Sequence, residues 1–139
     1  MSDRMLWRYG DTNPVMAAVN PYTVIEIGDL VYLDTDNVKP MFWTTMMTPE
    51  QLKKKFLGVA MQRSRRGEND PIRVATTGVF EFDCLNDTYE LGDLIGIAGK
   101  QDVIRTSRER AIGRVARRAP VKTSKVLVAI QSTVMVGGV

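Results

Sequence analysis

The sequence contains no histidine and a single cysteine, Cys84. Histidine is the most frequent general base of enzymes and a frequent metal ligand, so the common zinc sites and the histidine-based triads are excluded. One cysteine permits no intrachain disulfide, and a reducing compartment is therefore the easier expectation. We expect no catalytic residues, no metal and no cofactor, although an enzyme that uses only Asp, Glu, Lys or Tyr stays open.

Long hydrophobic runs are also absent. No apolar segment approaches the ~18 residues that a transmembrane helix needs, and the N-terminal stretch MSDRMLWRYGDTNP lacks the apolar core of a secretory signal. The 19 Lys and Arg residues exceed the 16 Asp and Glu residues by only 3. This mild excess demands neither nucleic acid nor an acidic surface as a partner. We expect a soluble protein, made in a cytoplasm, with no membrane partner.

Eight residues are almost repeated along the chain. The stretch EIGDLVYL occupies 26–33 and ELGDLIGI occupies 90–97, an offset of 64 positions. Gly permits backbone conformations that a Cβ forbids, and Asp accepts hydrogen bonds from nearby backbone N–H groups. Each Gly-Asp pair is therefore interpreted as a turn that leads into a buried strand.

Two further blocks repeat in the same order. LGVAMQR (57–63) corresponds to IGRVARR (112–118) at an offset of 55, and IRVATTGVFEF (72–82) corresponds to VLVAIQSTVMV (126–136) at an offset of 54. The block 57–63 alternates in the way of a half-buried strand. Three matches in one order predict a duplicated unit rather than a chance similarity.

The predicted fold is all-β: a small antiparallel β-barrel or sandwich built from two similar three-strand units. Unit one spans about 24–82 and unit two about 88–136, within a single barrel domain over 24–139. Residues 1–23 precede both units and are predicted to form an extended N-terminal arm. Closing the two units against each other removes most of the exposed strand edges.

The segment KPMFWTTMMTPEQLKKK (39–55) is an insertion that unit two lacks. Thr48 followed by Pro is typical of a helix start, so one short helix is predicted within 48–56 of this inserted loop. The apolar Phe42 and Trp43 either fold back over one end of the barrel or form an association surface.

The N-terminal arm contains Leu6, Trp7 and Tyr9, which have no predicted core of their own. Two interpretations stay open. The arm either straps across its own barrel, or it anchors on a neighbouring subunit, because aromatic residues, Met and Arg are enriched at interface cores. In the second case the arm would be dispensable for folding.

A basic corner follows the Gly-containing strand in each unit. The corners consist of Arg63, Arg65 and Arg66 in unit one and of Arg114, Arg117 and Arg118 in unit two. They form either a solvated rim or a contact to a phosphate backbone. Nucleic-acid binding would require the two corners to adjoin as one unneutralised basic face, yet GEND follows the first corner directly.

The order IGDLVYL, LGVAMQ, PIRVATTGVFEF, YELGDLIGI, AIGRVARR, VLVAI resembles that of the capsid cement proteins, also called head decoration proteins, of tailed bacteriophages. The motifs that carry this resemblance are GD at 28–29, GVA at 58–60 and GVFE at 78–81. The similarity runs from about residue 24 to about residue 131. The arm and the Met- and Trp-rich insertion lie outside the family pattern.

The resemblance implies a non-enzymatic virion protein that binds the outer surface of an icosahedral capsid and stabilises contacts between major capsid subunits. The implied partners are the major capsid protein and further copies of the chain, with a homotrimer favoured. The implied locations are the virion capsid surface and, during assembly, the host cytoplasm. Candidate partner-binding residues are Leu6, Trp7, Tyr9, Phe42, Trp43, Arg63, Arg65 and Arg66. The alternatives are a small nucleic-acid-binding β-barrel that uses the Arg-rich loops, and an enzyme or enzyme accessory domain.

Overall fold

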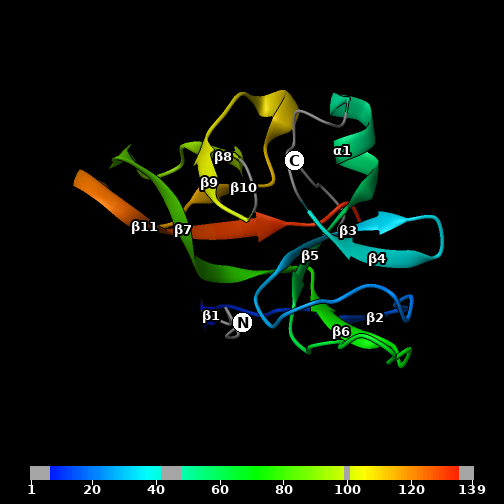
Figure 1. Cartoon of the computed structure of the whole chain (residues 1–139). Coiled ribbons are helices and arrows are strands. Elements are labelled where there is room, and N and C mark those ends of the chain that lie inside the picture. Colours follow the sequence, from blue (N-terminus) through cyan, green and yellow to red (C-terminus); the bar gives the residue numbers. More distant parts are fainter. Residues whose placement is uncertain (1–6, 42–47, 99–100, 135–139) are drawn as a thin grey trace.

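The computed structural model describes residues 7–41, 48–98 and 101–134, which form an all-β protein with one α-helix (Figure 1). The strands are β1 (Trp7–Tyr9), β2 (Val15–Ala17), β3 (Leu30–Asp34), β4 (Asn37–Pro40), β5 (Phe56–Ala60), β6 (Ile72–Ala75), β7 (Thr77–Tyr89), β8 (Leu94–Ile97), β9 (Val103–Arg105), β10 (Gly113–Val115) and β11 (Ala119–Gln131). One sheet has the order β1-β7-β11-β10-β8-β9, and the other has the order β2-β6-β5-β3-β4. Strand β9 also pairs in parallel with β7, so β7 to β11 close into a barrel. The all-β prediction is confirmed.

Without β1, the two sheets have the same strand order. The sequence β2-β6-β5-β3-β4 corresponds strand by strand to β7-β11-β10-β8-β9. We call β2 to β6 the first repeat and β7 to β11 the second repeat. The duplication predicted from the sequence is therefore a duplication of structure.

The cross-strand register repeats as well. The pair Leu30–Val59 of the first repeat corresponds to Leu94–Arg114 of the second, and Ala60–Val74 corresponds to Val115–Val128. Equivalent residues are 64 positions apart in the Gly-Asp strand, 55 apart in the Gly-containing strand and 54 apart in the Val-Ala strand. The three offsets read from the sequence are thus confirmed by hydrogen-bonded registers.

Both Gly-Asp turns make the same hydrogen bonds. The carboxylate of Asp29 accepts the N–H of the Glu three positions earlier at 3.0 Å, and that of Asp93 does so at 2.9 Å. The glycine of each turn has a positive φ, +95° at Gly28 and +86° at Gly92, which L side chains rarely adopt. The prediction of two equivalent turns is confirmed.

Each repeat has its own buried core, and the two cores match position by position. The first consists of Ala17, Val19, Ile25, Val31, Val38, Leu57, Ala60, Ile72 and Val74. The equivalent residues of the second repeat are Phe82, Cys84, Tyr89, Ile95, Val103, Ile112, Val115, Val126 and Val128. In the first repeat the Val38 N–H donates to the Ala18 carbonyl at 2.9 Å, where the second repeat has its parallel pairing of β7 with β9.

The structure corrects the predicted composition of the units. Each repeat has five strands instead of three, because β2 and β7 precede the Gly-Asp turn and β4 and β9 follow the Gly-Asp strand. The predicted block 72–82 divides at Thr76, whose N–H and hydroxyl bond the carbonyl oxygens of Thr12 and Asn13 at 2.8 and 2.6 Å. Strand β6 therefore ends the first repeat, and β7 begins the second.

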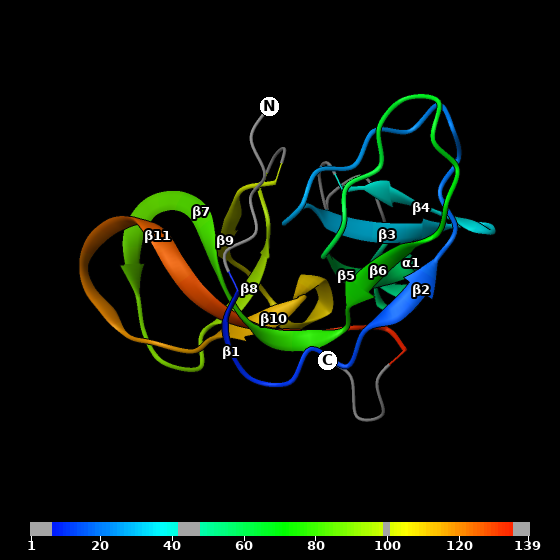
Figure 2. The ribbon, with the colours of Figure 1, turned by 90° about the horizontal axis from the view of Figure 1, so that it is seen from below.

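The described part of the arm packs on the chain itself. Strand β1 pairs with β7 and strand β2 with β6, so the segment runs from the edge of the second repeat to the edge of the first (Figure 2). Ala17 and Val19 are buried in the core of the first repeat. These contacts agree with the strap interpretation and make Ala17 and Val19 part of the folded core. The boundaries of the domain remain a prediction.

The predicted helix is confirmed as α1 (Pro49–Lys55). Gln51 donates its N–H to the Thr48 hydroxyl at 3.2 Å, and Thr48 donates its N–H to the Gln51 side chain at 3.0 Å, which is a reciprocal capping box. The second repeat has a short 3₁₀ helix, η2 (Arg108–Arg110), at the same place before its Gly-containing strand. The insertion therefore enlarges an element that both repeats share.

Candidate functional site

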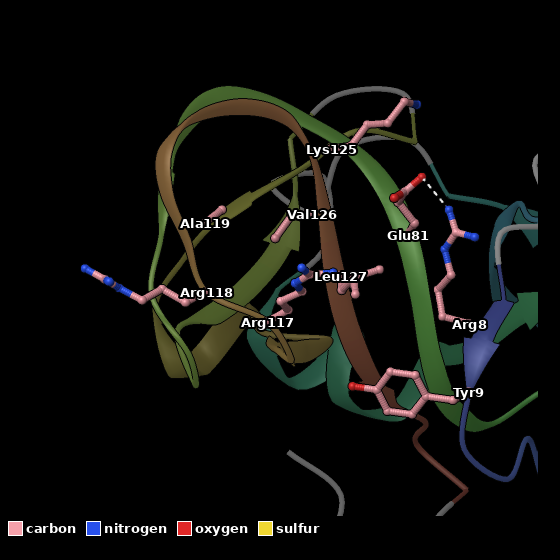
Figure 3. Close-up of a pocket in the computed structure, with 9 residues that line it drawn as sticks. All are labelled: Arg8, Tyr9, Glu81, Arg117, Arg118, Ala119, Lys125, Val126 and Leu127. Atoms are coloured by element: carbon pink, nitrogen blue, oxygen red, sulfur yellow. Dashed lines mark hydrogen bonds and ion pairs between the residues drawn. The ribbon is translucent and has the colours of Figure 1, made fainter.

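An open groove of about 590 Å³ lies on the outer face of the second repeat, where β1, β7 and β11 are neighbours (Figure 3). We call it the basic groove. Its side chains include Arg8, Tyr9, Arg117, Arg118, Lys125 and Leu127. The strands β1, β7 and β11, together with the loop that directly precedes β11, supply this surface.

Strand alternation determines which residues face the groove. On β7, Phe80 and Phe82 are buried inside the barrel, so Glu81 between them faces outward. On β11, Leu127 lies opposite Glu81 and faces the same way. The register of β1 on β7 shifts between Trp7 and Tyr9, which is the irregularity at which Arg8 lies.

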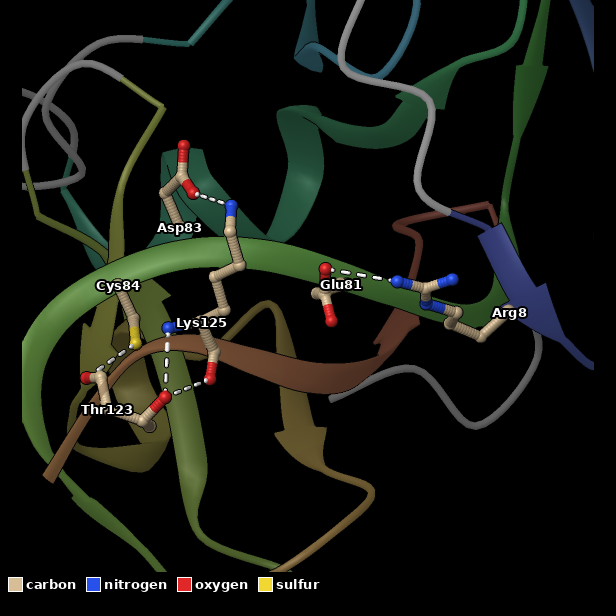
Figure 4. Close-up of polar contacts among 6 residues, drawn as sticks. All are labelled: Arg8, Glu81, Asp83, Cys84, Thr123 and Lys125. Atoms are coloured by element: carbon tan, nitrogen blue, oxygen red, sulfur yellow. Dashed lines mark hydrogen bonds and ion pairs between the residues drawn. The ribbon is translucent and has the colours of Figure 1, made fainter. Parts of the chain in front are cut away.

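Three of the four cations in the groove are held by carboxylates. These ion pairs are Arg8–Glu81 at 3.1 Å, Arg118–Glu90 at 2.8 Å and Lys125–Asp83 at 2.6 Å. Figure 4 shows the first and the last of them. The hydrogen bond to Asp83 raises the pKa of Lys125, and that to Glu90 raises the pKa of Arg118. Because these side chains are exposed, except for the half-buried Glu81, the pairs orient the cations and add little stability.

Arg117 differs from the other three cations. Within the described part of the chain it makes no ion pair and no side-chain hydrogen bond. It lies beside Leu127 in the groove, whereas Arg118 points outward (Figure 3). The ring of Tyr9, which is 52% exposed, lines the same groove. The guanidinium of Arg117 therefore lies next to apolar surface and can still donate two hydrogen bonds to one carboxylate.

The structure brings only part of the predicted site together. Tyr9 lies in the basic groove, and Trp7 on the same strand is 46% exposed. Leu6, Phe42 and Trp43 lie outside the described residues. The sequence did not indicate Arg8 or Lys125, because their convergence depends on the pairing of β1 with β7.

The two basic corners do not form one face. Arg63, Arg65 and Arg66 belong to the loop after β5, and Figures 1 and 2 show this loop far from the loop between β10 and β11. The carboxylate of Glu68 accepts the Arg65 N–H at 2.7 Å, which places an acidic group at the first corner. The condition for the nucleic-acid alternative is therefore not met by the described residues.

The one cysteine is a core residue. Cys84 is buried, and its thiol donates to the Thr123 carbonyl at 3.6 Å (Figure 4). Burial raises the pKa of this thiol, so the reactive thiolate is disfavoured. Among the residues that the structure describes, no three Cys, Asp or Glu side chains gather as metal ligands, and no helix there is long and apolar enough to cross a bilayer.

No protein-family model and no curated protein matches the sequence. The fold is similar to the crystal structure of the N base of the head fiber gp8.5 in bacteriophage phi29. The TM-score is 0.52 at 12% sequence identity, and the similarity covers 85% of this chain and 94% of that chain. At this level of identity the comparison shows a shared fold.

Proposed function

We propose that the chain is a structural protein of a bacteriophage virion that binds the outer surface of the capsid. The observation that carries this proposal is the shared fold with the base of a phage head fiber, over 85% of the chain. The motif order that resembles capsid cement proteins is an independent support, because it rests on residues and not on shape.

The architecture suits a mechanical role. Two small repeats share one layer of buried side chains, which includes Leu30, Met41 and Leu52 of the first repeat and Ile97 of the second. A folded body that binds across neighbouring capsid subunits stabilises the assembled shell over its separated parts by mass action. This role needs no catalysis and no cofactor. The partner that we propose is the major capsid protein.

The proposed contact surface is the outer face of β1, β7 and β11 with the basic groove. It combines exposed aromatic side chains of β1, Trp7 and Tyr9, with cations that converge from β1, β11 and the loop before β11. Aromatic residues and Arg are the residue types that dominate binding energy at protein interfaces. The resemblance further supports a homotrimer, which sedimentation equilibrium of the purified chain would reveal as three times its mass of 15.6 kDa.

The direct test is reconstitution on phage heads from which the chain has been removed or deleted. Purified chain is added at increasing concentration, and the heads are sedimented with whatever they bind. We expect saturable binding at a fixed ratio to the major capsid protein, and heads that resist a higher temperature once they are decorated. Dissociated capsid subunits are the control, because a protein that spans subunits should bind them less tightly than the assembled shell. Absence of saturable binding to the heads would contradict the proposal.

A further inference from the structure

We propose that the basic groove takes an extended acidic segment of the capsid, with one carboxylate on Arg117 and a neighbouring apolar side chain on Leu127 and Tyr9. This inference rests on the proposed function and adds the chemistry of the partner. It gives Arg117, which makes no ion pair within the described part of the chain, a role in recognising the partner.

Charge selects the class of the ligand. The groove cations are Arg8, Arg117, Arg118 and Lys125, and the carboxylates that touch them are Glu81, Asp83 and Glu90. Four positive and three negative groups leave one net positive charge. A nucleic-acid backbone is bound through several phosphates at once, each of which needs its own cation. One net charge fits one carboxylate, so an acidic peptide is favoured over nucleic acid.

Local geometry holds Arg117 beside its apolar neighbours. The residue before it, Ala116, donates its N–H to the Leu127 carbonyl at 2.9 Å, so the loop stays against β11. Leu127 is half-buried and Tyr9 is half-exposed, so each leaves apolar surface in the groove that also holds the Arg117 guanidinium. An ion pair formed there would be partly shielded from water and therefore stronger than one on an open surface.

Comparison of the repeats shows that the groove is not a by-product of the fold. The first-repeat residues at the positions of Glu81, Arg117, Lys125 and Leu127 are Met16, Gln62, Pro71 and Arg73. Gln62 accepts the Arg73 N–H at 2.7 Å, and so it takes a hydrogen bond from its own β6. Strand β2, the counterpart of β7, is an edge strand in the described sheet, with no equivalent of β1. Only the second repeat combines a cation at the position of Arg117, an apolar side chain at the position of Leu127 and a neighbouring strand such as β1.

The first test compares Arg117→Glu with Arg108→Glu in binding to phage heads. Both arginines are exposed, and Arg108 lies in η2, outside the residues that line the groove. We expect R117E to weaken binding at least about tenfold, because it replaces a charge-assisted bond by repulsion, and R108E to bind as the parent does. Melting curves of both variants show whether the fold is intact. Parental binding by a folded R117E would overturn the groove assignment and leave the proposed function standing.

The second test needs no phage heads. A ¹⁵N-labelled chain is titrated with an acetylated peptide of alternating Glu and Leu, with the same peptide carrying Gln for Glu, and with a short DNA duplex. We expect amide shifts at Arg117, Leu127 and Tyr9 with the Glu peptide, and shifts at least about fivefold smaller for the Gln peptide at equal concentration. Equal shifts with both peptides, or larger shifts with the duplex, would overturn the proposal. Should heads fail to bind while the Glu peptide binds at Arg117, the groove chemistry stands and the capsid function fails.

Discussion

The side-chain amide of Gln101 hydrogen-bonds both backbone groups of Leu30, across the boundary between the two repeats. Its Oε1 accepts the Leu30 N–H at 2.6 Å, and its Nε2 donates to the Leu30 carbonyl at 3.0 Å and to the Met41 carbonyl at 2.9 Å. Gln101 is 7% exposed and has a φ of +70°. One side chain of the second repeat thus serves as the strand partner of the first, and it joins the two cores through polar groups that cannot reach water.

Replacement of Gln101 by Ala should therefore destabilise the whole chain. The change leaves the buried Leu30 N–H without its acceptor, and an unsatisfied buried group costs about 1–3 kcal/mol. We expect a loss of about 2–3 kcal/mol in the free energy of unfolding, measured by urea denaturation. Gln62→Ala is the matched control, because Gln62 also accepts a backbone N–H, from Arg73, but in an exposed position. An equal loss in both variants would show that burial of Gln101 is unimportant.

Gly58 and Gly113 occupy equivalent positions at which a Cβ does not fit. A Cβ on Gly58 would overlap the Ala75 carbonyl oxygen, and a Cβ on Gly113 would overlap the Ala129 carbonyl oxygen. We expect each Gly→Ala variant to lose at least about 3 kcal/mol or to remain unfolded, because the backbones of paired strands must separate. At Gly67 a Cβ meets no atom within 4 Å, although φ is +93°, so Gly67→Ala should lose only about 1 kcal/mol. Thermal melting of the three variants measures the difference.

The equivalence of the two repeats predicts which residue can replace Cys84. Its counterpart in the first core is Val19, which is also buried and follows β2 by two residues. We expect Cys84→Val to change the free energy of unfolding by less than about 1 kcal/mol, because it loses one weak thiol hydrogen bond and adds only about one methyl group, at a position where the first repeat already holds Val. Cys84→Ser, which introduces a buried hydroxyl, should cost more than Cys84→Val. The opposite ranking in urea denaturation would contradict the equivalence of the two cores.

Stability should decrease at alkaline pH. Burial raises the pKa of Cys84 above its ordinary 9.0 and that of Tyr89 above its ordinary 10.0. The folded state therefore holds these protons more tightly than the unfolded state, and unfolding releases them once the pH exceeds about 9. The stabilisation is complete below that pH and is lost as the pH rises toward the folded-state values. Urea denaturation at pH 8, 9 and 10 measures the decrease, and Cys84→Val should show a shallower one.

Two N-terminal truncations distinguish the role of β1 from that of β2. Deletion of residues 2–9 removes β1 and two groove residues, Arg8 and Tyr9, but leaves the carbonyl groups that Thr76 and Thr77 bond. We expect this variant to unfold cooperatively and to bind phage heads less tightly. Deletion of residues 2–20 also removes the buried Ala17 and Val19, and we expect it to lose the cooperative transition. Cooperative melting of the longer deletion would show that β2 is dispensable for folding and that the dispensable arm extends to residue 20 or beyond.

The Gly-Asp turns and the three offsets could be predicted because each rests on local chemistry that the sequence displays. Gly28 and Gly92 need a positive φ, and the strands after them carry runs of apolar residues long enough to recognise. Strands β2, β4 and β9 could not be predicted, since they have only 3, 4 and 3 residues and, unlike the equally short β8 and β10, lie in none of the repeated blocks. So few residues show no alternation, and tertiary pairing alone makes them strands.

The candidate site could be predicted only in part. Arg117 and Arg118 stood out as a basic corner, and Tyr9 as an aromatic residue outside the repeats. That these residues meet depends on β1 crossing to β7, a pairing between positions about 70 apart for which neither segment has a signal of its own. The insertion likewise looked unique to the first half, because η2 has only three residues and no capping box in the sequence.

The copy number of this chain in purified virions, relative to the major capsid protein, shows whether the chain is a structural protein of the capsid surface. Quantitative mass spectrometry of gradient-purified particles, with isotope-labelled peptides of both proteins, gives that ratio. We expect a fixed ratio near a simple fraction of the capsid subunits, unchanged after nuclease treatment and lowered in particles whose chain carries Arg117→Glu. A chain that is absent from the particles, or present only in traces that vary between preparations, would contradict the claim that it is a structural protein of the capsid surface.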